Sequence, residues 1–331
     1  MNIVSPMPRG NGAYIIHQLL SENIRDYTLQ GYNPYWTLSP PALRFLFQNN
    51  ASADIIHTTP DYGCFFAQKK IPLVLTFHNF VLDDYMREHS SLAQKIHYRT
   101  LLRKFTQHSL QMAHDVTSVS HFTANIVQKE LDYYGRVRVI YNGVDQERFK
   151  PIHRKERRTV KVLFSGNLTR RKGANLLPEI AEKLNSNISI LYTSGLRNRT
   201  TLSDRQNFRN IGRIPFSAMH TVYQDVDILL FPTVREGFGL AVAEAMACGL
   251  PVVATNCSSL PELVVDGKGG YLCKIGDTDE FAQRINELAE SSLLRRTMGE
   301  FNRERVERKF TLQKMIQMYT DLFTEILDRK N

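Results

Sequence analysis

Short apolar stretches rich in β-branched residues alternate along the chain with longer segments in which apolar residues follow the helical period. The short stretches predict strands and the longer segments predict helices. In the first half, the predicted strands are 2–5, 54–58, 72–77, 115–120 and 136–141, and the predicted helices lie near 13–24, 92–112 and 121–132. In the second half, the predicted strands are 160–165, 188–193, 226–232 and 251–255, and the predicted helices lie near 174–185, 216–224, 239–248, 277–291 and 312–328.

The two halves meet at the segment PIHRKERRTV (151–160), which is highly charged and carries four basic residues. Its polarity is typical of a linker, and the alternation of strands and helices restarts after it. Each half therefore predicts a parallel sheet covered by helices. Because ligands bind such sheets at the carboxyl ends of the strands, two halves of this kind predict a cleft between them.

The composition is that of an ordinary globular protein: of the 331 residues, 42% are hydrophobic and 23% are charged, a length sufficient for two domains. No apolar run approaches the length that spans a bilayer, and the first residues lack the apolar core of a signal peptide. The four cysteines have no metal-ligand spacing, and we interpret them as free thiols. These features predict a protein of the reducing cytoplasm.

The net charge of +9 favours anionic partners, namely phosphates, acidic lipid surfaces or nucleic acid. The sequence has no zinc-finger or RNA-recognition signature and no interleaving of aromatic and basic residues, so it favours nucleic acid least. The predicted helix 92–112 carries Lys95, Arg99 and Arg103 at four-residue spacing beside an apolar stripe. This basic stripe could lie against anionic lipid headgroups at the inner face of a membrane, although a solvated helix face is the alternative.

The segment FPTVREGFGLAVAEAMACG (231–249) follows a predicted strand and leads into a predicted helix. Gly237 and Gly239 allow a tight turn and close approach to a ligand, and the start of the helix offers unpaired N–H groups to an anion. Glu236 precedes this helix, and Glu244 lies within it among small alanines. A buried carboxylate needs partners, which ligand hydroxyls can provide. The alternative is that these charges complement the helix dipole and pair with an arginine.

Four other segments place polar or glycine residues directly after predicted strands. FSGNLTRRKGANLL (164–177) brings Lys172 close to a helix start, where it could face anionic oxygen, or it could be a solvated basic loop. Gly10 and Gly12 in MPRGNGAY allow close backbone approach, unless they only form a strand-to-helix turn. His78 in TFHNF could contact a substrate or simply pack at the strand end. Ser120 could cap the helix that follows it, contact an acceptor, or do both.

These segments, together with VIYNGVDQERFKP (139–151), resemble the retaining nucleotide-sugar glycosyltransferases with the two-domain GT-B fold. This large family carries an E-x7-E element, matched here by Glu236 and Glu244, and includes bacterial lipopolysaccharide and mannosyl transferases. The resemblance is strong across 139–310 and weaker across 1–135. The chain departs from the family pattern at three places: Asn167 replaces an arginine, Asn79 replaces an aspartate, and residues 258–260 replace a Gly-Gly pair before Pro-Glu.

The resemblance implies an α/β fold of two Rossmann-like parallel-sheet domains that face a central cleft. It implies an N-terminal acceptor-side domain over 1–150, a C-terminal nucleotide-sugar-binding domain over 151–311, and a final helix over 312–331 that packs back on the N-terminal domain. The implied reaction moves a sugar from a nucleoside-diphosphate sugar to a hydroxyl of a glycan or lipid-linked glycan, with retention of configuration. We expect no cofactor and no metal, since cationic side chains and backbone amides would stabilise the leaving diphosphate.

The resemblance also assigns roles to individual residues. Glu244 would bond the ribose hydroxyls, Glu236 the hydroxyls of the transferred sugar, and Lys172 with a nearby arginine the diphosphate. The implied catalytic residues are Glu236, His78 and Lys172. The implied donor-binding residues are Gly12, Asn167, Arg171, Lys172, Arg213, Ile214, Gly237, Phe238, Gly239, Leu240 and Glu244, and the implied acceptor-side residues are Gly10 and Ser120.

Two alternatives share this architecture. A sugar-nucleotide epimerase would convert the nucleotide sugar without any acceptor, and a non-catalytic nucleotide-sugar-binding subunit would do no chemistry. The departures at Asn167 and Asn79 keep the second alternative open. A phosphorylase would be expected to carry a lysine-bound pyridoxal cofactor, for which the sequence offers no support.

Overall fold

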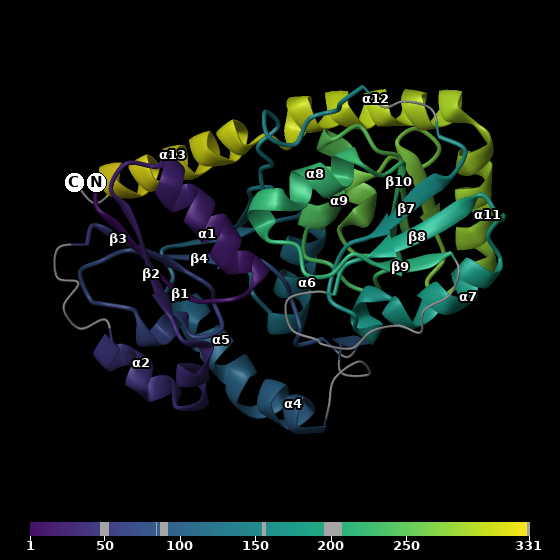
Figure 1. The fold of residues 1–331 in the computed structure, drawn as a ribbon. Coiled ribbons are helices and arrows are strands. Elements are labelled where there is room, and N and C mark those ends of the chain that lie inside the picture. The colour runs from purple at the N-terminus through teal and green to yellow at the C-terminus, as the bar shows by residue number, and fades with distance from the viewer. Residues whose placement is uncertain (47–52, 84, 87–91, 154–156, 195–206, 330–331) are drawn as a thin grey trace. The chain divides into compact units, whose positions relative to one another are not determined.

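The computed structural model describes residues 1–46, 53–83, 85–86, 92–153, 157–194 and 207–329 (Figure 1). The chain divides into two compact units, the first formed by Met1–Asn142 with Gln313–Asn331 and the second by Gly143–Leu312. The charged segment that the sequence analysis interprets as a linker lies within the second unit, and its residues 154–156 are outside the described ranges.

The first unit is built on a six-stranded parallel sheet with the order β2-β1-β3-β4-β5-β6. The strands are β1 (Ile3–Pro8), β2 (Tyr27–Tyr32), β3 (Ile55–Thr58), β4 (Leu73–Phe77), β5 (Asp115–Ser118) and β6 (Val137–Val139). The helices are α1 (Gly12–Asn23), α2 (Pro40–Leu46), α4 (Leu92–His97), α5 (Arg103–Met112), α6 (His121–Leu131) and α13 (Leu312–Asp328). A π-helical turn at Tyr98–Leu102 joins α4 to α5, so the predicted helix 92–112 is interrupted.

The second unit repeats this plan with the strand order β12-β11-β10-β7-β8-β9, again all parallel. The strands are β7 (Val160–Phe164), β8 (Ile188–Tyr192), β9 (Phe208–Asn210), β10 (Ile228–Phe231), β11 (Val252–Thr255) and β12 (Gly270–Cys273). The helices are α7 (Leu177–Glu182), α8 (Met219–Gln224), α9 (Leu240–Ala247), α10 (Leu260–Leu263), α11 (Thr278–Glu290) and α12 (Ser292–Lys309). The predicted α/β fold class, with two Rossmann-like parallel sheets, is confirmed.

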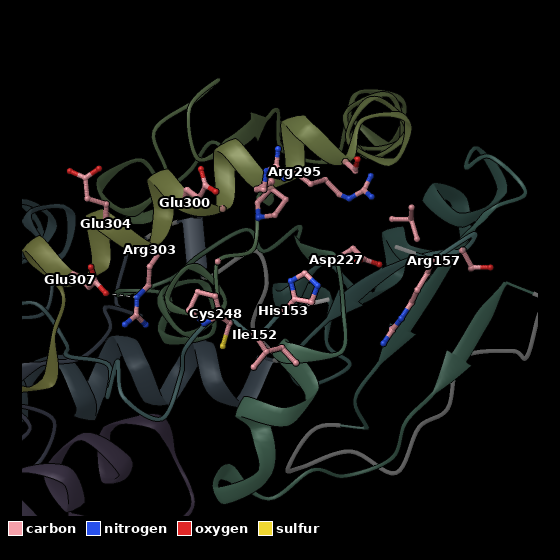
Figure 2. A pocket seen from close by; sticks show the side chains of 18 residues that line it. Ile152, His153, Arg157, Asp227, Cys248, Arg295, Glu300, Arg303, Glu304 and Glu307 are labelled. Atoms are coloured by element: carbon pink, nitrogen blue, oxygen red, sulfur yellow. Dashed lines mark hydrogen bonds and ion pairs between the residues drawn. The ribbon is translucent and has the colours of Figure 1, made fainter. Parts of the chain in front are cut away.

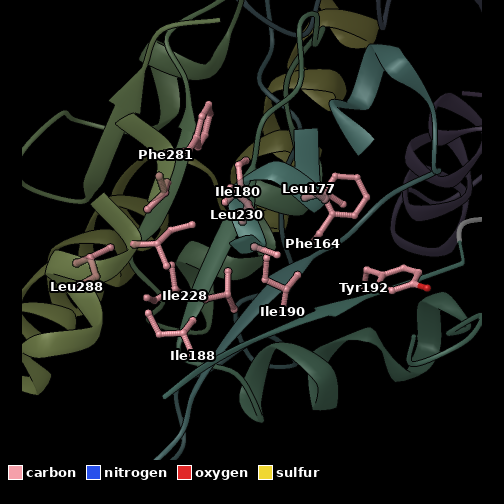
Figure 3. Close-up of a cluster of buried hydrophobic side chains, with 14 of the residues drawn as sticks. Phe164, Leu177, Ile180, Ile188, Ile190, Tyr192, Ile228, Leu230, Phe281 and Leu288 are labelled. Atoms are coloured by element: carbon pink, nitrogen blue, oxygen red, sulfur yellow. The ribbon is translucent and has the colours of Figure 1, made fainter. Parts of the chain in front are cut away.

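The core of the second unit explains why its strands are apolar throughout. Both faces of a parallel sheet are covered by helices, so successive residues are buried on opposite sides. Figure 3 shows one such face, where side chains two positions apart on a strand point to the same helices. The cluster joins Ile188 and Ile190 of β8, Ile228 and Leu230 of β10, Leu177 and Ile180 of α7, and Phe281 and Leu288 of α11. Burying each side chain of this kind contributes about 1.5–3 kcal/mol.

The strand order creates a switch point in each sheet. In the second unit the chain leaves β7 toward β8 and β9, and it then returns to place β10 on the other side of β7. The loops that follow β7 and β10 therefore start side by side at the carboxyl edge, where ligands of such sheets bind. In the first unit the same reversal lies between β1 and β3.

Candidate functional site

The loops after β7 and β10 are joined directly at the switch point of the second sheet. The carbonyl of Arg171 accepts hydrogen bonds from the Val234 amide and the Thr233 hydroxyl, both at 2.9 Å. The Arg171 guanidinium in turn donates to the carbonyl of Arg235 at 2.9 Å. Gly173 ends the first loop with a φ of +75°, and a Cβ there would lie 2.0 Å from the carbonyl oxygen of Pro232. Only glycine allows the two loops to approach this closely.

These loops bring together three of the residues that the sequence analysis selects: Lys172, Arg171 and Glu236. The ammonium of Lys172 forms an ion pair with the Glu236 carboxylate, and the Arg171 guanidinium lies 3.7 Å from the same oxygen. The Thr233 hydroxyl lies 3.2 Å from that oxygen. Burial lowers the pKa of Lys172, and the charge of Glu236 opposes this shift. Two cations and one carboxylate thus share a half-buried position, which leaves an excess of positive charge for an anionic ligand.

The turn after β11 supports the backbone of this carboxylate. The Glu236 amide donates to the Ser258 hydroxyl at 2.9 Å, and the Ser259 hydroxyl donates to the Phe238 carbonyl at 3.0 Å. Ser258 has a φ of +47°, a left-handed conformation that costs a non-glycine residue roughly 1–2 kcal/mol. Ser258, one of the residues that replace the Gly-Gly pair, therefore has a strained backbone. Its hydroxyl accepts a hydrogen bond from the loop that carries Glu236. A hydrogen bond of this kind contributes about 1 kcal/mol, which offsets much of the strain.

Glu244 is buried in α9, with 5% of the residue exposed, and its partner is a residue that the sequence analysis did not select. The Tyr223 hydroxyl of α8 donates to the Glu244 carboxyl group at 3.0 Å and lies 3.5 Å from the Ser165 hydroxyl. Burial raises the pKa of Glu244 to about 8, although the Tyr223 hydrogen bond and the charge of Arg148 act in the opposite direction. The carboxyl group is therefore mostly protonated at pH 7, and it can both donate to and accept from hydroxyl groups.

The remaining residues selected in the second unit lie at the same edge of the sheet. Gly239 caps α9 with a φ of +96°, and Leu240 begins the helix, whose first amides have no preceding turn to bond. Phe238 is buried against Phe310, with ring centroids 5.8 Å apart, so it contributes to the core. Asn167 lies in the loop after β7. Arg213, which is exposed, and Ile214 follow β9, next to Gly212, whose carbonyl accepts a hydrogen bond from the Ser194 amide at 2.9 Å.

In the first unit, the selected residues also follow strands. Gly10 has a φ of +82° and open space around it, and Gly12 is the first residue of α1, which Asn11 caps. Ser120 is buried and caps α6 by accepting a hydrogen bond from the Thr123 amide at 3.1 Å. His78 follows β4, and burial lowers its pKa to about 3, so its ring is neutral at pH 7.

Asp61 is a further residue that sequence reasoning missed. It follows β3, at the switch point of the first sheet, and burial raises its pKa to about 6. The tyrosines Tyr32 and Tyr62 lie near it, and its charge raises their pKa values further. No sequence motif identifies Asp61 as a site residue. It reaches the switch point only because the chain places β3 on the side of β1 opposite to β2.

The basic stripe predicted on 92–112 takes a different form in the structure. The Arg103 side chain donates to the carbonyl of Glu130, so it caps α6 from within the unit and does not form part of a solvated stripe. The side chains of Lys95 and Arg99 lie outside the described part of the structure. Within the described residues, no helix is both long and apolar enough to cross a membrane.

A separate cavity of about 630 Å³ lies at the opposite, amino edge of the second sheet (Figure 2). It is lined by the start of β7, by Asp227 before β10, and by α12. Three of the arginines that line it are engaged: Arg157 pairs with Asp225, Arg295 donates to two carbonyls at the end of α11, and Arg303 pairs with Glu307. These charges stabilise the local structure and do not indicate a ligand class.

Two tripeptides have the spacing Asp-x-Asp, which in other proteins can hold a metal, and both serve the fold here. In 225–227, Asp225 pairs with Arg157 and Lys161, and Asp227 accepts from the Lys161 amide. In 277–279, Asp277 caps α11 and Asp279 pairs with Lys183. Within the described residues, no group of three histidine, cysteine, aspartate or glutamate side chains is arranged to hold a metal ion.

The family assignment agrees with this geometry. Residues 145–305 match the model of the glycosyl transferases group 1, and residues 3–148 match that of glycosyltransferase family 4. The chain belongs to the glycosyltransferases with the GT-B fold.

Relatives and solved structures extend the comparison. An uncharacterized glycosyltransferase of Methanocaldococcus jannaschii is 27% identical over 68% of this chain and 64% of its own length. The N-acetyl-α-D-glucosaminyl L-malate synthase of Bacillus anthracis is 39% identical over 32% of this chain and 28% of its own. The matches thus span less than two thirds of these relatives. Sucrose-phosphate synthase from Thermosynechococcus elongatus superposes with a TM-score of 0.83 at 17% identity, covering 99% of this chain and 100% of that one. Anabaena HepE in complex with UDP-glucose has a TM-score of 0.79 at 19% identity, covering 98% and 100%.

We predict that Gly173→Ala destabilises the second unit by roughly 2–4 kcal/mol, because the added methyl group meets the backbone of Pro232 and the left-handed backbone is strained. Urea denaturation measures the difference. The matched control is Gly267→Ala, whose φ of +70° is similar but whose surroundings are open, so that only the strain of about 1 kcal/mol remains. Equal losses in both variants would contradict the close approach of the two loops.

We predict that Glu244→Gln stabilises the ligand-free protein in a pH-dependent manner. The folded pKa of about 8 exceeds the ordinary value of 4.5, so the stability that Glu244 contributes is full below 4.5 and is lost as the pH rises toward 8. The variant escapes this loss, which reaches roughly 3 kcal/mol at pH 7 at about 1.4 kcal/mol per pH unit. Urea denaturation at pH 5 and pH 8 tests it, with the exposed Glu300→Gln as control. A difference that does not change with pH would disprove the burial of a protonated carboxyl group.

Proposed function

We propose that this protein transfers a sugar from a nucleoside-diphosphate sugar to a hydroxyl of a glycan or lipid-linked glycan, with retention of configuration. The observation that carries the proposal is the cluster of Lys172, Arg171 and Glu236 at the switch point, next to the start of α9. A diphosphate is bound by cations and backbone amides, and sugar hydroxyls are bound by carboxylates. This edge of the sheet supplies both kinds of group. The UDP-glucose complex of Anabaena HepE, which shares the fold, supports a donor of this class.

Donor binding would exchange the partner of Lys172. In the ligand-free protein its ammonium is paired with Glu236, and this pair keeps two half-buried charges compensated. When diphosphate oxygens replace the carboxylate as the partner of Lys172 and Arg171, Glu236 becomes available to accept hydrogen bonds from the hydroxyls of the transferred sugar. Lys172 then faces the leaving diphosphate, whose charge increases as the glycosidic bond breaks.

Glu244 would bind the ribose of the donor. Its carboxyl group is held by Tyr223 on one side, so its orientation is set before the ligand arrives. Ribose hydroxyls would add the hydrogen bonds that a buried carboxyl group needs. His78 would contact the sugar as a neutral ring, and Gly10 and Ser120 are proposed on the acceptor side.

For the chemical step, we assign no covalent nucleophile. The departing phosphate would remove the proton of the acceptor hydroxyl on the same face of the sugar, which retains the configuration. Because Lys172, Arg171 and the first amides of α9 would stabilise the leaving group, the reaction would need no divalent metal or other cofactor.

We predict different kinetic defects for the two charged positions. Lys172→Ala should lower kcat about 100-fold or more, since its contact strengthens as the leaving group forms, whereas Glu244→Ala should mainly raise KM for the donor. The assay follows release of the nucleoside diphosphate from a panel of nucleotide sugars, preselected by thermal shift. The exposed Lys268→Ala is the control, and activity should persist in EDTA. Unchanged kinetics in both variants would overturn the assigned roles, and conversion of the donor to another sugar nucleotide without acceptor would favour an epimerase.

A lipid-linked acceptor is supported by exposed apolar side chains of the first unit. Leu38 and Phe45 are 83% and 71% exposed, and Tyr35 and Trp36 lie beside them in the turn Pro34–Leu38. Figure 1 shows α2, α5 and α4 on one side of the first sheet. Exposed aromatic residues suit a membrane interface, and the net charge of +9 complements an anionic surface. We propose that this face contacts anionic lipid from the cytoplasmic side.

Trp36 is the only tryptophan of the chain, so its fluorescence reports on this face alone. We predict a blue shift of the emission on vesicles that contain phosphatidylglycerol, weakened by salt, and none on pure phosphatidylcholine. Leu38→Asp should reduce binding at least about tenfold, because a leucine loses its apolar contact. Leu293→Asp is the matched control, since Leu293 is 62% exposed on α12 of the second unit. Emission that does not change, or an equal loss in both variants, would exclude this contact.

A further inference from the structure

Behind His78, the core of the first unit contains a connected set of polar side chains. Ser5, His17, His57 and Thr76 are buried, and they belong to β1, α1, β3 and β4. Buried polar groups in an apolar core are costly unless each is hydrogen-bonded. No motif in the sequence connects these residues, because they lie on different strands and helices and meet only in the folded unit.

The distances join these side chains into one chain of hydrogen bonds. His78 Nε2 lies 3.0 Å from His17 Nε2, and His17 Nδ1 lies 2.7 Å from the Ser5 hydroxyl and 2.8 Å from the Tyr27 hydroxyl. The Tyr27 hydroxyl also lies 2.8 Å from His57 Nδ1, and His57 Nε2 lies 2.7 Å from the Thr76 hydroxyl. One line of contacts thus leads from the strand end at His78 into the core.

The direction of these hydrogen bonds can be deduced. Burial lowers the pKa of His17 and His57 well below the ordinary range, so both rings are neutral, as is that of His78. A neutral imidazole has one N–H donor and one acceptor nitrogen, so the tautomer of His17 determines that of His78, which it contacts ring to ring. Two arrangements satisfy this condition, and they differ in whether His17 carries its proton on Nδ1 or on Nε2.

Two features favour the proton on Nδ1 of His17. In that case a single N–H is shared between the Ser5 and Tyr27 oxygens, a common three-centre geometry, whereas in the reverse case two hydroxyl donors would compete for one nitrogen lone pair. His17 Nε2 then accepts from His78 Nε2–H. His78 Nδ1, which is buried and has no hydrogen-bond partner in the described part of the chain, is left with a lone pair, which costs less than a buried, unpaired N–H.

We propose that His17 is a positioning residue that holds His78 as the Nε2–H tautomer, so that His78 Nδ1 accepts a hydrogen bond from a substrate hydroxyl. Hydrogen bonds to Ser5 and Tyr27 hold the His17 ring in place. His57, which is itself bonded to Thr76, holds the Tyr27 hydroxyl in the same way. His78 thereby selects a hydroxyl donor rather than a carbonyl or phosphate oxygen, which would need an N–H. The ligand class rests on the proposed sugar transfer, but the tautomer does not.

The test measures the tautomer without substrate. Long-range proton–nitrogen NMR of the ¹⁵N-histidine protein at pH 7 should show His78 with a protonated Nε2 and a bare Nδ1. His17→Leu removes the acceptor and should convert His78 to a mixture of tautomers, whereas His17→Gln offers an amide oxygen at the same reach and should preserve the Nε2–H form. The control is His108→Leu, an exposed histidine of α5. A wild-type His78 protonated on Nδ1, or an unchanged tautomer in His17→Leu, would overturn the proposal.

Kinetics then connect the tautomer to function. In the sugar-transfer assay, kcat/KM should fall about tenfold in His17→Leu, the value of one well-oriented hydrogen bond, and recover in His17→Gln. Thermal unfolding confirms that each variant is folded. If the tautomers behave as expected while the wild type transfers no sugar, the proposed function fails and the positioning role of His17 stands. If the wild type transfers sugar and both His17 variants lose activity equally with His78 unchanged, the positioning role fails alone.

Discussion

The half-buried ion pair between Lys172 and Glu236 is the interaction on which the candidate site of the second unit depends. It joins the loops after β7 and β10, the two strands between which the sheet order reverses. An ion pair in this position gains little net stability, because each charge loses water when it is buried. Its value lies in the exchange of partners that it permits: an anionic ligand can take the place of Glu236 and leave the carboxylate ready for hydroxyl groups.

Backbone geometry makes this ion pair possible. The approach of the two loops requires a residue without Cβ at Gly173, and the turn behind Glu236 contains a left-handed residue at Ser258. Ser258 is one of the residues 258–260 that stand in place of the Gly-Gly pair, and its hydroxyl accepts a hydrogen bond from the Glu236 amide. Ser258 thus has two effects: its backbone strains this turn, and its hydroxyl bonds the loop of Glu236. Precise placement of the carboxylate is achieved by the surrounding loops rather than by the helix that follows.

The sequence predicts the elements whose burial has a clear period and misses those whose pattern is weak. The runs 72–77 and 226–232 predict β4 and β10, because strands buried on both faces are apolar throughout. Strand β2 (Tyr27–Tyr32) escaped prediction because it is a partly exposed edge strand, and β9 has only three residues. Helix α12 also escaped, since it is polar on most sides and buries small or polar residues such as Gly299 and Asn302. For the site, Glu236, Glu244 and His78 follow from local motifs. Their respective supporting residues Ser258, Tyr223 and His17 do not, because those contacts join distant parts of the chain.

The first unit is discontinuous in sequence, since its last helix arrives only after the entire second unit. Helix α13 covers the polar chain in its core: Tyr319 lies against His57 and 3.3 Å from the Thr76 hydroxyl, and Glu325 forms an ion pair with Arg138 of β6. During synthesis, residues 143–312 are therefore made before the helix that completes the core of the first unit. All six strands of the first sheet lie within residues 1–142, but the side of His57 that Tyr319 contacts stays uncovered until α13 has been made, so the first unit completes its core only after the residues of the second unit have been synthesised.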